Sequence, residues 1–380
     1  MKIIIDKDIP YAKELFGSIT TKLYLVNGRN ISRTLLMTVD VLIIRSVTIV
    51  NEELLKHTPV KFVGSVTSGY DHVDIHWLKK NDIYFCAAIG SNAISVSEYI
   101  FSSLLLYAEY NSFNLKDKVV GIIGVGNIGK YLNLCLRTWG VSTLLCDPPR
   151  ERIELDKYNK NKFYSLEYVI TYADIISLNV SLHNSKEYST MHLLDSNLIA
   201  QIPSGSLIIN TSRGAVIDNI AILDALSRGK LINLILDVWE NEPNILLPLL
   251  KNTVFGTPHI AGHSIEGKIR GAIKIFNELN SFLGISKNIK STNFLVFPQL
   301  SEIIFNGVLH QKDLMNLTNV VYDIRIDDYQ FKSIAHISGS FDKFRSYYKI
   351  RREWSSMKIK CDNINTANLL NKIGFHAYII

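Results

Sequence analysis

Short apolar runs alternate along the chain with longer segments in which apolar residues recur every three or four positions. The runs predict buried strands, and the longer segments predict helices that bury one face. The predicted strands cover residues 3–5, 39–44, 62–63, 83–85, 119–123, 143–146, 175–178, 207–210, 234–237 and 254–255. This alternation is typical of parallel sheets with helices on both faces. Because ten strands exceed one doubly wound sheet, we expect two α/β lobes.

Two long helical patterns mark where the chain is expected to pass between the lobes. Ser95 and Glu98 have the spacing of a capping box ahead of the first pattern, and the second covers residues 265–283. Residues 287–293 are polar, and the alternation is lost after them, which indicates a small α+β domain at the C-terminus. The predicted divisions are 1–95 with 265–286 for the first lobe, 96–264 for the second lobe, and 287–380 for the C-terminal domain.

Composition narrows the class of protein. The 380 residues are 47% hydrophobic and 20% charged, as in ordinary globular domains. No apolar run reaches the roughly 18 residues of a membrane span, and Asp6 ends the first apolar run, so we expect neither a transmembrane helix nor a signal peptide. The cysteines form no CxxC pair and no His/Cys cluster has metal-ligand spacing, which predicts reduced thiols in the cytoplasm and no metal site.

The excess of basic residues fits a protein with anionic ligands. The formal charge is +6, and the sequence pI is about 8.9. The densest basic stretch runs from Lys343 to Arg352, and no nucleic-acid-binding module surrounds it. We interpret this stretch as a solvated or subunit-facing helix side, and predict neither a nucleic-acid nor a membrane partner.

A glycine-rich turn follows the predicted strand at 119–123. Gly124, Gly126 and Gly129 have the spacing that permits a tight turn, close approach to a pyrophosphate, and helix–strand packing. The free N–H groups at the start of the following helix, including those of Asn127 and Ile128, would face the phosphates. Alone, the motif often marks only a turn, but between a strand and a helix it indicates a Rossmann-like dinucleotide site.

The acid expected to bind the adenine ribose is Asp147, at the end of the next predicted strand. It follows Gly129 by 18 residues, close to the typical distance of about 20. A carboxylate there accepts both ribose hydroxyls and repels a 2′-phosphate, so NAD is favoured over NADP. Arg150 opposes that preference, and a simple turn residue before Pro148 is the alternative interpretation of Asp147.

Three later strands each end in a polar segment, and these segments contain Arg213, Glu242 and His259. Ligands bind at the carboxyl ends of strands in open α/β sheets, so the three side chains are expected to converge on one cleft. Histidine is the usual base for a hydroxyl proton, a carboxylate fixes its tautomer, and arginine holds a substrate carboxylate. Each residue alone could be structural, but together, behind a dinucleotide loop, they predict oxidation of an alcohol by hydride transfer.

The chain resembles the D-isomer-specific 2-hydroxyacid dehydrogenases over nearly its whole length. The similar motifs lie at 44–48, 67–74, 124–129 with 147, 210–214, 237–243 and 257–262. The resemblance implies two Rossmann-like lobes, with NAD bound in the second, and oxidation of a small phosphorylated 2-hydroxy acid. It implies Arg213 and Glu242 as catalytic residues and His259 as the proton donor and acceptor.

The resemblance also implies ligand contacts and an assembly. The implied NAD contacts are Gly124, Gly126, Asn127, Ile128, Gly129, Asp147, Val180, Asp237 and Gly262, and the implied substrate contacts are Ser46, Thr67 and His263, with Arg45 beside them. Hydroxyls beside an arginine and a glycine-containing loop suit a phosphate. The stretches 341–343 and 351–356 resemble a dimerisation domain that most of the family lacks, which implies a homodimer through the C-terminal domain.

Two positions depart from the family pattern. The usual His-Thr-Pro is Asn179-Val180-Ser181, so a side-chain hydroxyl contact is lost while Val180 still offers its backbone. The usual tyrosine is His263, which can still donate to a phosphate. A third departure is the segment around residues 158–163, which is rich in Lys and Asn and aligns poorly. We interpret all three as drift in a working enzyme, and an enzyme that has lost activity is the alternative.

Three hypotheses of function remain open from the sequence. The first is the dehydrogenase of the branch that carries the C-terminal domain. The second is a dehydrogenase for 3-phosphoglycerate or glycerate, and the third is a non-enzymatic NAD-sensing interaction protein. Ser46, Thr67 and the C-terminal stretches favour the first.

Overall fold

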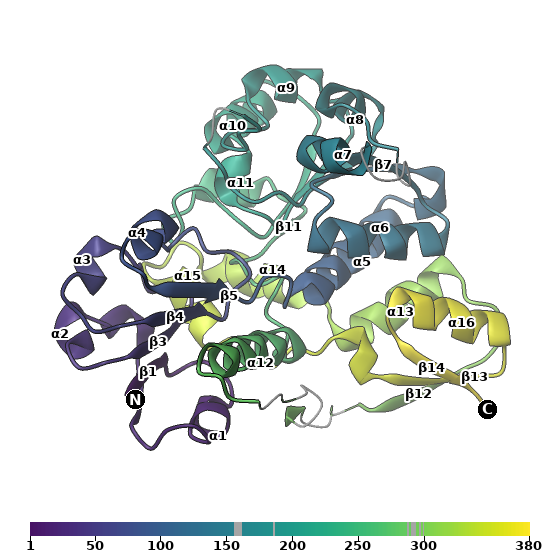
Figure 1. Cartoon of the computed structure of the whole chain (residues 1–380). Helices are drawn as coiled ribbons and strands as arrows, with labels where there is room; N and C mark the ends of the chain where they lie inside the picture. Colours follow the sequence, from purple (N-terminus) through teal and green to yellow (C-terminus); the bar gives the residue numbers. More distant parts are fainter. Residues whose placement is uncertain (156–161, 185–186, 287–288, 290–293, 296–297, 299) are drawn as a thin grey trace. The chain divides into compact units, whose positions relative to one another are not determined.

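The computed structural model describes residues 1–155, 162–184, 187–286, 289, 294–295, 298 and 300–380 (Figure 1). It divides into two compact units, residues 1–92 with 263–296 and residues 93–262 with 297–380. The chain passes between them at Asn92/Ala93 and at Gly262/His263. The sequence predicts these two crossings at 95/96 and 264/265. The C-terminal residues belong to the second unit, so their status as a third domain stays a prediction.

The first unit contains a parallel five-stranded sheet in the order β2-β1-β3-β4-β5. Its strands are β1 (Ile3–Asp6), β2 (Leu23–Val26), β3 (Val41–Ile44), β4 (Phe62–Ser65) and β5 (Tyr84–Ala87). Four of them lie where the apolar runs predict strands. The edge strand β2, whose side chains are only partly buried, is absent from the prediction.

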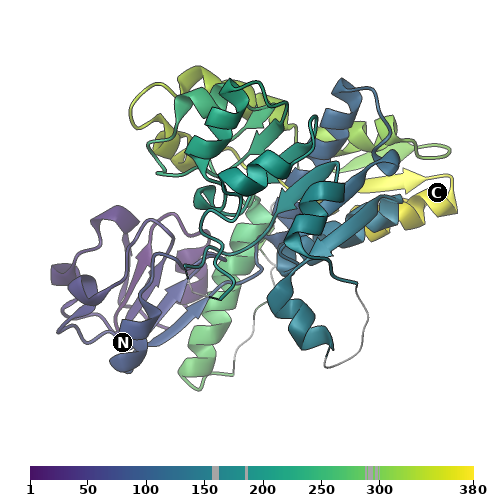
Figure 2. The same cartoon turned by 90° about the horizontal axis from the view of Figure 1, so that it is seen from above.

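Helices cover both faces of this sheet, as the alternating pattern predicts (Figures 1 and 2). One face packs against α1 (Ala12–Phe16) and α12 (Ile265–Phe282). The other face packs against α2 (Arg33–Leu36), α3 (Glu52–Leu55) and α4 (Ile75–Lys80). The inner strands β1, β3 and β4 are buried on both sides, which explains their continuous apolar runs.

The second unit contains a parallel six-stranded sheet in the order β11-β10-β9-β8-β6-β7. Its strands are β6 (Val119–Ile123), β7 (Ser142–Cys146), β8 (Ile175–Leu178), β9 (Leu207–Asn210), β10 (Asn233–Leu236) and β11 (Phe255–Gly256). Helices α5 (Ala93–Tyr110) and α6 (Asn127–Trp139) pack on one face. On the other face lie α8 (Leu166–Tyr172), α9 (Ser196–Gln201), α10 (Asn219–Ser227) and α11 (Leu247–Lys251), and α7 (Pro148–Leu155) follows β7. Both doubly wound sheets are therefore confirmed.

Helix α5 begins earlier than predicted. Its first residue is Ala93, so Ser95 lies in the first turn rather than at the N-cap. The expected partner of the capping box, Glu98, accepts a hydrogen bond from the backbone N–H of Trp354 at 3.0 Å. The predicted capping box is wrong, because the helix already begins at Ala93 and Ser95 is therefore not its N-cap.

The C-terminal residues form a small parallel sheet with four helices. Its strands are β12 (Glu302–Phe305), β13 (Lys358–Cys361) and β14 (His376–Ile379), in that order. The helices are α13 (Gln311–Val321), α14 (Ile324–Ile334), α15 (Ser340–Ser346) and α16 (Ile364–Ile373). The predicted mixture of strands and helices is present, and α16 makes the crossover between the parallel strands β13 and β14.

This C-terminal segment shares the hydrophobic cores of the second unit. Leu314 and Trp354 belong to the same buried cluster as helices α5 and α6, and Phe331 and Phe341 belong to the cluster on the other face of the six-stranded sheet. The Trp354 ring stacks on Phe375 with centroids 5.1 Å apart and lies 5.9 Å from the ring of Phe101. The second unit is therefore one packed body.

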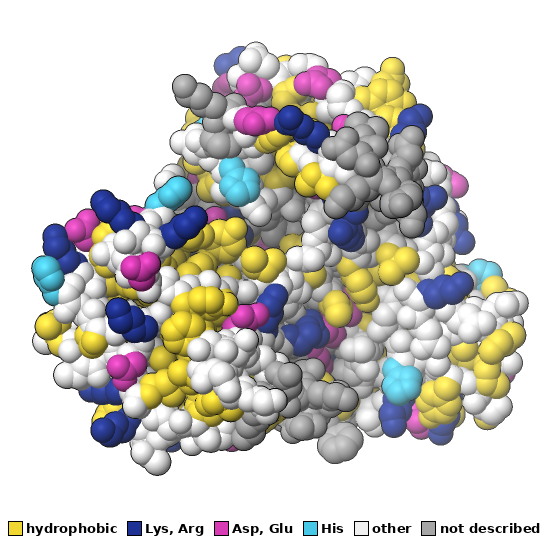
Figure 3. Space-filling view, viewed as in Figure 1, with side chains coloured by type: hydrophobic (Ala, Val, Ile, Leu, Met, Phe, Trp, Pro, Cys, Tyr) yellow, Lys and Arg dark blue, Asp and Glu magenta, His cyan; other side chains and the backbone are white. Residues whose placement is uncertain are grey.

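Charged side chains are dispersed over the surface. On the face drawn in Figure 3, Lys and Arg lie scattered among acidic, polar and apolar groups rather than in one basic patch. Within the part of the chain that the structure describes, no helix has the length and apolarity needed to cross a membrane. All four cysteines are free, and burial raises the pKa of Cys86 and of Cys146 to about 12.

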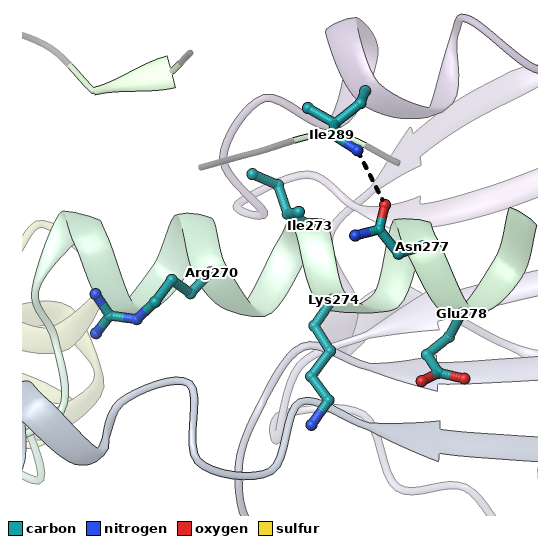
Figure 4. A pocket seen from close by; sticks show the side chains of 6 residues that line it. All are labelled: Arg270, Ile273, Lys274, Asn277, Glu278 and Ile289. Carbon is teal, nitrogen blue, oxygen red and sulfur yellow. Dashed lines mark hydrogen bonds between the residues drawn. The ribbon is translucent and has the colours of Figure 1, made fainter. Parts of the chain in front are cut away.

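A groove runs along α12 in the first unit. It is lined by Arg270, Ile273, Lys274, Asn277, Glu278 and Ile289 (Figure 4). Arg270 Nε donates to the carbonyl of Ser91 at 2.9 Å, and Lys274 Nζ donates to that of Ile89 at 3.1 Å. Asn277 Oδ1 accepts from the N–H of Ile289 at 3.4 Å. These side chains hold neighbouring chain segments against the helix.

Because the core of the second unit is shared, removing Trp354 should destabilise all of it. We expect Trp354→Ala to lower the free energy of unfolding by about 3–5 kcal/mol, the range for large aromatic side chains in cores. Tyr347→Ala is the control, since that side chain is 82% exposed and its loss should change stability by less than about 0.5 kcal/mol. Urea unfolding measures both. A Trp354→Ala protein that loses only a separate C-terminal transition would contradict the shared core.

Candidate active site

The glycine-rich turn joins β6 to α6 in the geometry of a dinucleotide site. Gly124 has a φ of +87°, which side chains disfavour, and a Cβ on Gly129 would lie 2.1 Å from the Gly124 carbonyl oxygen. Gly126, by contrast, has no heavy atom within 4 Å of where its Cβ would be. The backbone at Gly126 is thus open to a ligand. Asn127 and Ile128 begin α6, so their N–H groups lack helical partners.

Two buried polar atoms at the ends of the next strands also fit a dinucleotide. Among the described residues, Asn179 Oδ1 and Thr211 Oγ1 are buried and have no hydrogen-bond partner in the protein. They follow β8 and β9, at the carboxyl edge of the same sheet. The side chain of Val180 packs against the position of Gly124. A turn open at Gly126 with unsatisfied polar atoms beside it suits a phosphate-bearing, hydrogen-bonding cofactor such as NAD.

Asp147 lies at the end of β7 and contacts the glycine-rich turn. Its Oδ2 accepts the N–H of Val125 at 2.8 Å, and its Oδ1 accepts that of Arg150 at 3.1 Å. The guanidinium of Arg150 donates to the carbonyl of Val125. Both residues therefore hold the turn. Contact of Asp147 with the adenine ribose stays a prediction.

A buried carboxylate, Asp237, organises the loop that follows β11. Asp237 is 1% exposed, and its two oxygens accept the N–H groups of Ile260 at 2.7 Å and Ala261 at 2.9 Å. Its backbone carbonyl accepts the N–H of His259 at 2.6 Å. Three successive amides thus bond to one residue. This bonding holds His259 at a φ of +57°, a conformation that side chains rarely adopt. Gly262 follows the loop and is half-buried.

The side chain of His259 pairs with Glu242, as the sequence predicts. His259 Nδ1 lies 2.8 Å from Glu242 Oε2, and Glu242 Oε1 accepts the N–H of Trp239 at 2.9 Å. Because Nδ1–H donates to the carboxylate, the lone pair of the neutral ring lies on Nε2. The His259 side chain is 32% exposed, so Nε2 is available to take a proton from a ligand.

The two carboxylates of the site differ in their acidity. Burial would raise the pKa of Glu242, but the charge and hydrogen bond of His259 and the Trp239 N–H outweigh it, so the pKa is lowered. Burial raises the pKa of Asp237, and the hydrogen bonds that it accepts only reduce the rise. Glu242 is therefore the carboxylate suited to stabilise a positive charge on His259.

Arg213 follows β9, which lies beside β10 in the sheet. Its loop packs backbone to backbone against the Glu242-bearing loop, because a Cβ on Gly214 would lie 1.8 Å from the carbonyl carbon of Trp239. Arg213 is half-buried, and its Nη1 donates to the carbonyl of Ser212 at 2.8 Å. The strands β9, β10 and β11 thus carry Arg213, Glu242 and His259 on adjacent loops of one sheet edge.

Two further polar residues, Thr257 and Tyr99, support the His259 loop. No sequence motif indicates that they pair. Thr257 Oγ1 donates to Asp237 Oδ1 at 2.7 Å and lies 2.6 Å from the hydroxyl of Tyr99. Since the single Thr257 proton goes to Asp237, Tyr99 donates to Thr257. Tyr99 lies on α5, 158 residues away in sequence, so no local pattern could have indicated the contact.

In the first unit, Arg45 and Ser46 follow β3. Arg45 Nε donates to Asp6 Oδ2 at 2.9 Å, and its Nη2 donates to Asp8. These two carboxylates therefore neutralise the positive charge of Arg45, which the sequence pattern places beside a substrate phosphate. Ser46 is exposed on the turn after β3.

Thr67 follows β4, the neighbour of β3 in the sheet. Its hydroxyl donates to the carbonyl of Gly69 at 2.9 Å and lies 2.7 Å from Ser65 Oγ. Binding a phosphate through this hydroxyl requires it to turn away from Gly69. His263 is half-buried immediately before Ser264, whose Oγ caps α12.

A separate cluster joins His192, Asp218 and Glu240 in the second unit. His192 Nε2 lies 2.6 Å from Glu240 Oε1, and Glu240 Oε2 accepts the N–H of Asn219 at 2.9 Å. Asp218 Oδ1 caps α10 through the N–H groups of Ile220 and Ala221. These hydrogen bonds account for the cluster as a structural contact between adjacent loops.

The lowered pKa of Glu242 predicts a pH-dependent stability. A glutamate whose folded pKa lies below its ordinary value of 4.5 stabilises the fold fully above 4.5, and the stabilisation is lost as pH falls through the folded value. The amide of Glu242→Gln does not titrate. We expect the unfolding free energy of the wild type minus that of the variant to be level above about pH 6 and to fall below about pH 4.5. Urea unfolding across this range measures it; a difference that grows as the pH falls below about 4.5 would be incompatible with the lowered pKa.

Comparison with known proteins shows the family of the chain. The D-isomer-specific 2-hydroxyacid dehydrogenase NAD-binding domain matches residues 102–261, and a domain of unknown function matches residues 294–374. An erythronate-4-phosphate dehydrogenase of Baumannia cicadellinicola subsp. Homalodisca coagulata is 45% identical over 381 residues, with both chains covered completely. The enzyme of that name from Yersinia enterocolitica is 44% identical over 380 residues, again over both full lengths.

Solved structures share the fold at lower identity. A D-lactate dehydrogenase from Aquifex aeolicus, complexed with NAD and lactic acid, has a TM-score of 0.62 at 23% identity and covers 74% of this chain and 96% of its own. An NAD-bound 3-phosphoglycerate dehydrogenase from Entamoeba histolytica has a TM-score of 0.63 at 22% identity and covers 76% of this chain and 96% of its own. At these identities the likeness shows the fold alone.

The full-length relatives also explain the C-terminal segment. Within the family, the stretches 146–150, 341–343 and 351–356 most resemble the erythronate-4-phosphate dehydrogenases. The full-length match confirms this resemblance. Together with the matched NAD-binding domain and the dehydrogenase fold, the match leaves one assignment. The chain belongs to the erythronate-4-phosphate dehydrogenases, within the NAD-dependent D-isomer-specific 2-hydroxyacid dehydrogenases.

Proposed function

We propose that the protein oxidises 4-phospho-D-erythronate with NAD, giving 2-oxo-3-hydroxy-4-phosphobutanoate and NADH, in pyridoxal 5′-phosphate biosynthesis. The observation that carries the proposal is the His259–Glu242 pair, with 2.8 Å between Nδ1 and Oε2, next to the Arg213 loop and on the same sheet edge as the glycine-rich turn. The full-length identity of 44–45% to enzymes of that name supports the choice of substrate.

Three residues of the second unit, Arg213, His259 and Glu242, each have a role in this reaction. Arg213 binds the substrate carboxylate through its guanidinium, whose fork matches two carboxylate oxygens. His259 Nε2 takes the proton of the 2-hydroxyl as the C2–H bond breaks. Glu242 stabilises the imidazolium that results and holds the ring in the tautomer that leaves Nε2 free. In the reverse direction the same imidazolium returns the proton.

The cofactor site lies at the same edge of the sheet. Gly124, Gly126 and Gly129, with the N–H groups of Asn127 and Ile128, would hold the pyrophosphate, and Asp147 would hold the adenine ribose. Val180, Asp237 and Gly262 would contact the rest of the NAD molecule. NAD, when bound, supplies the acceptor for the hydride that leaves C2.

In the first unit, we propose Ser46, Thr67 and His263 as ligands of the substrate phosphate. Ser46 and Thr67 follow adjacent strands, and ligands of α/β sheets bind at that edge. Arg45 lies beside Ser46 in the chain, but Asp6 and Asp8 already bind its guanidinium.

We further propose that the protein is a cytoplasmic homodimer. Four free thiols support a reducing compartment. The resemblance of the stretches 341–343 and 351–356 to a dimerisation domain supports pairing through the C-terminal segment. Sedimentation equilibrium tests the assembly, and a mass of one chain would exclude the dimer.

A substrate panel tests the function. We expect kcat/KM with NAD to be at least about tenfold higher for 4-phosphoerythronate than for 3-phosphoglycerate or glycerate, because a site that binds a group rejects analogues that lack it. NADH absorbance measures turnover. A higher value for 3-phosphoglycerate would assign a different dehydrogenase. Absence of turnover at every pH, with NADH still bound, would leave an NAD-binding protein without this activity.

Replacing the base tests its assignment. Asn tolerates the positive φ of residue 259, and its amide can still donate to Glu242 where Nδ1–H did. We therefore expect His259→Asn to lower kcat by about 10²–10⁴, the range for loss of general acid–base catalysis, with little change in the Kd for NADH. His336→Asn, at an exposed position, is the control. If His259→Asn keeps wild-type kcat, another group is the base.

A further inference from the structure

The loop that carries His259 is bonded to a residue of the C-terminal segment. Arg351 is 3% exposed, and its Nη1 donates to the carbonyl of Ala261 at 2.9 Å. Its Nη2 donates to the carbonyl of Ser95 at 2.8 Å. All three residues lie in the second unit. One buried guanidinium therefore joins the His259 loop to the first turn of α5.

Aromatic rings surround this guanidinium. Its carbon lies 3.8 Å from the centroid of the Tyr322 ring and 5.9 Å from that of Tyr99. The rings bind a cation through their π faces and exclude water, which strengthens the hydrogen bonds to the two carbonyls. Tyr99 is also the residue that donates to Thr257, so Arg351 contacts the support of Asp237 as well as the loop.

Arg351 and Asp237 bind the same residue from opposite sides. The N–H of Ala261 donates to Asp237 Oδ2 at 2.9 Å, while its carbonyl accepts from Arg351. His259 lies two residues before Ala261, at a φ of +57°. With both polar groups of Ala261 bonded, the loop cannot relax that φ by rotating the backbone after His259.

Two further residues of the C-terminal segment bind the chain just before this loop. Asp328 Oδ1 accepts the N–H of Gly256 at 2.7 Å. Lys332 Nζ donates to the carbonyl of Thr253 at 3.0 Å. Three side chains of the C-terminal segment, Asp328, Lys332 and Arg351, thus bond to the stretch from residue 253 to residue 261. Of these three, Arg351 binds the residue nearest to His259 along the chain.

The carbonyls bound by Arg351 also lie close, along the chain, to two of the points at which the chain passes between the units. The chain enters the second unit at Ala93, ahead of Ser95, and leaves it after Gly262, which follows Ala261. Within the second unit, Arg351 therefore binds the backbone near the residue where the chain enters the unit and near the residue where it leaves.

We propose that Arg351 is a positioning residue for the reaction: it holds the His259 loop so that Nε2 faces the substrate hydroxyl. The proposal rests on the proposed role of His259. It assigns to the C-terminal segment a part in catalysis besides any part in assembly. In this proposal Arg351 acts through the loop and not by contact with substrate or cofactor.

The test replaces the guanidinium while keeping its apolar stem. We expect Arg351→Met to lower kcat by about 10–100-fold, because small misplacements of catalytic groups have effects of that size, while the Kd for NADH changes less than about threefold. Hydrogen exchange of the peptide containing Ile260 and Ala261 should become about tenfold faster, since its amides lose a buried hydrogen-bonded support. Arg351→Lys, which keeps a donor, should recover part of kcat.

Arg325→Met is the matched control. It removes a guanidinium from the same segment, but Arg325 bonds to the side chain of Asp323 at a partly exposed position. We expect wild-type kcat and exchange. Unchanged kcat in Arg351→Met, or unchanged exchange at Ile260 and Ala261, would overturn the proposal, as would a parallel weakening of NADH binding. If Arg351→Met does not fold, a crystal structure of Arg351→Lys shows whether the ammonium still donates to the carbonyl of Ala261. Wild-type kcat and exchange in that variant without this hydrogen bond would overturn the proposal equally.

The exchange measurement separates this proposal from the proposed function. A wild-type protein that fails to oxidise 4-phosphoerythronate contradicts the function, while the exchange at Ile260 and Ala261 still reports whether Arg351 holds the loop. A panel acid that is turned over then serves for the kcat comparison.

Discussion

The candidate active site depends on the hydrogen bonds that one buried carboxylate, that of Asp237, accepts from backbone amides. Asp237 lies at the end of β10 and accepts the N–H groups of Ile260 and Ala261, while its own carbonyl accepts that of His259. A carboxylate that is removed from water requires such donors, and the loop requires an acceptor for three successive amides. Each therefore satisfies the other. The result is an imidazole held at a disfavoured φ, with Nδ1 directed at Glu242.

The rest of the second unit supports that loop from both sides. The parallel order of β9, β10 and β11 puts the loops with Arg213, Glu242 and His259 side by side. The C-terminal segment shares the core and bonds to the chain between residues 253 and 261. A segment that the full-length relatives also match is thus built into the unit that contains the candidate active site.

The sequence predicts much of the fold and of the site, because both follow local patterns. Continuous apolar runs predict both large sheets, and the spacing of Gly124, Gly126 and Gly129 predicts the turn before α6. Adjacent strand ends predict the pairing of Glu242 and His259. The contact between Arg351 and Ser95 joins residues 256 apart, and no local pattern encodes it. For the same reason the sequence offers Arg45 as a phosphate ligand, whereas the fold brings Asp6 and Asp8 to it.

The tautomer of His259 tests the central claim most directly. Long-range ¹H–¹⁵N correlation spectra of protein labelled at histidine nitrogen distinguish the two neutral forms of the ring, and His259→Asn identifies the signal. We expect the neutral ring to carry its proton on Nδ1, bonded to Glu242, and to leave Nε2 bare as the acceptor of the hydroxyl proton. A neutral ring with its proton on Nε2 would contradict this, because the nitrogen that faces the substrate would then have no lone pair to offer.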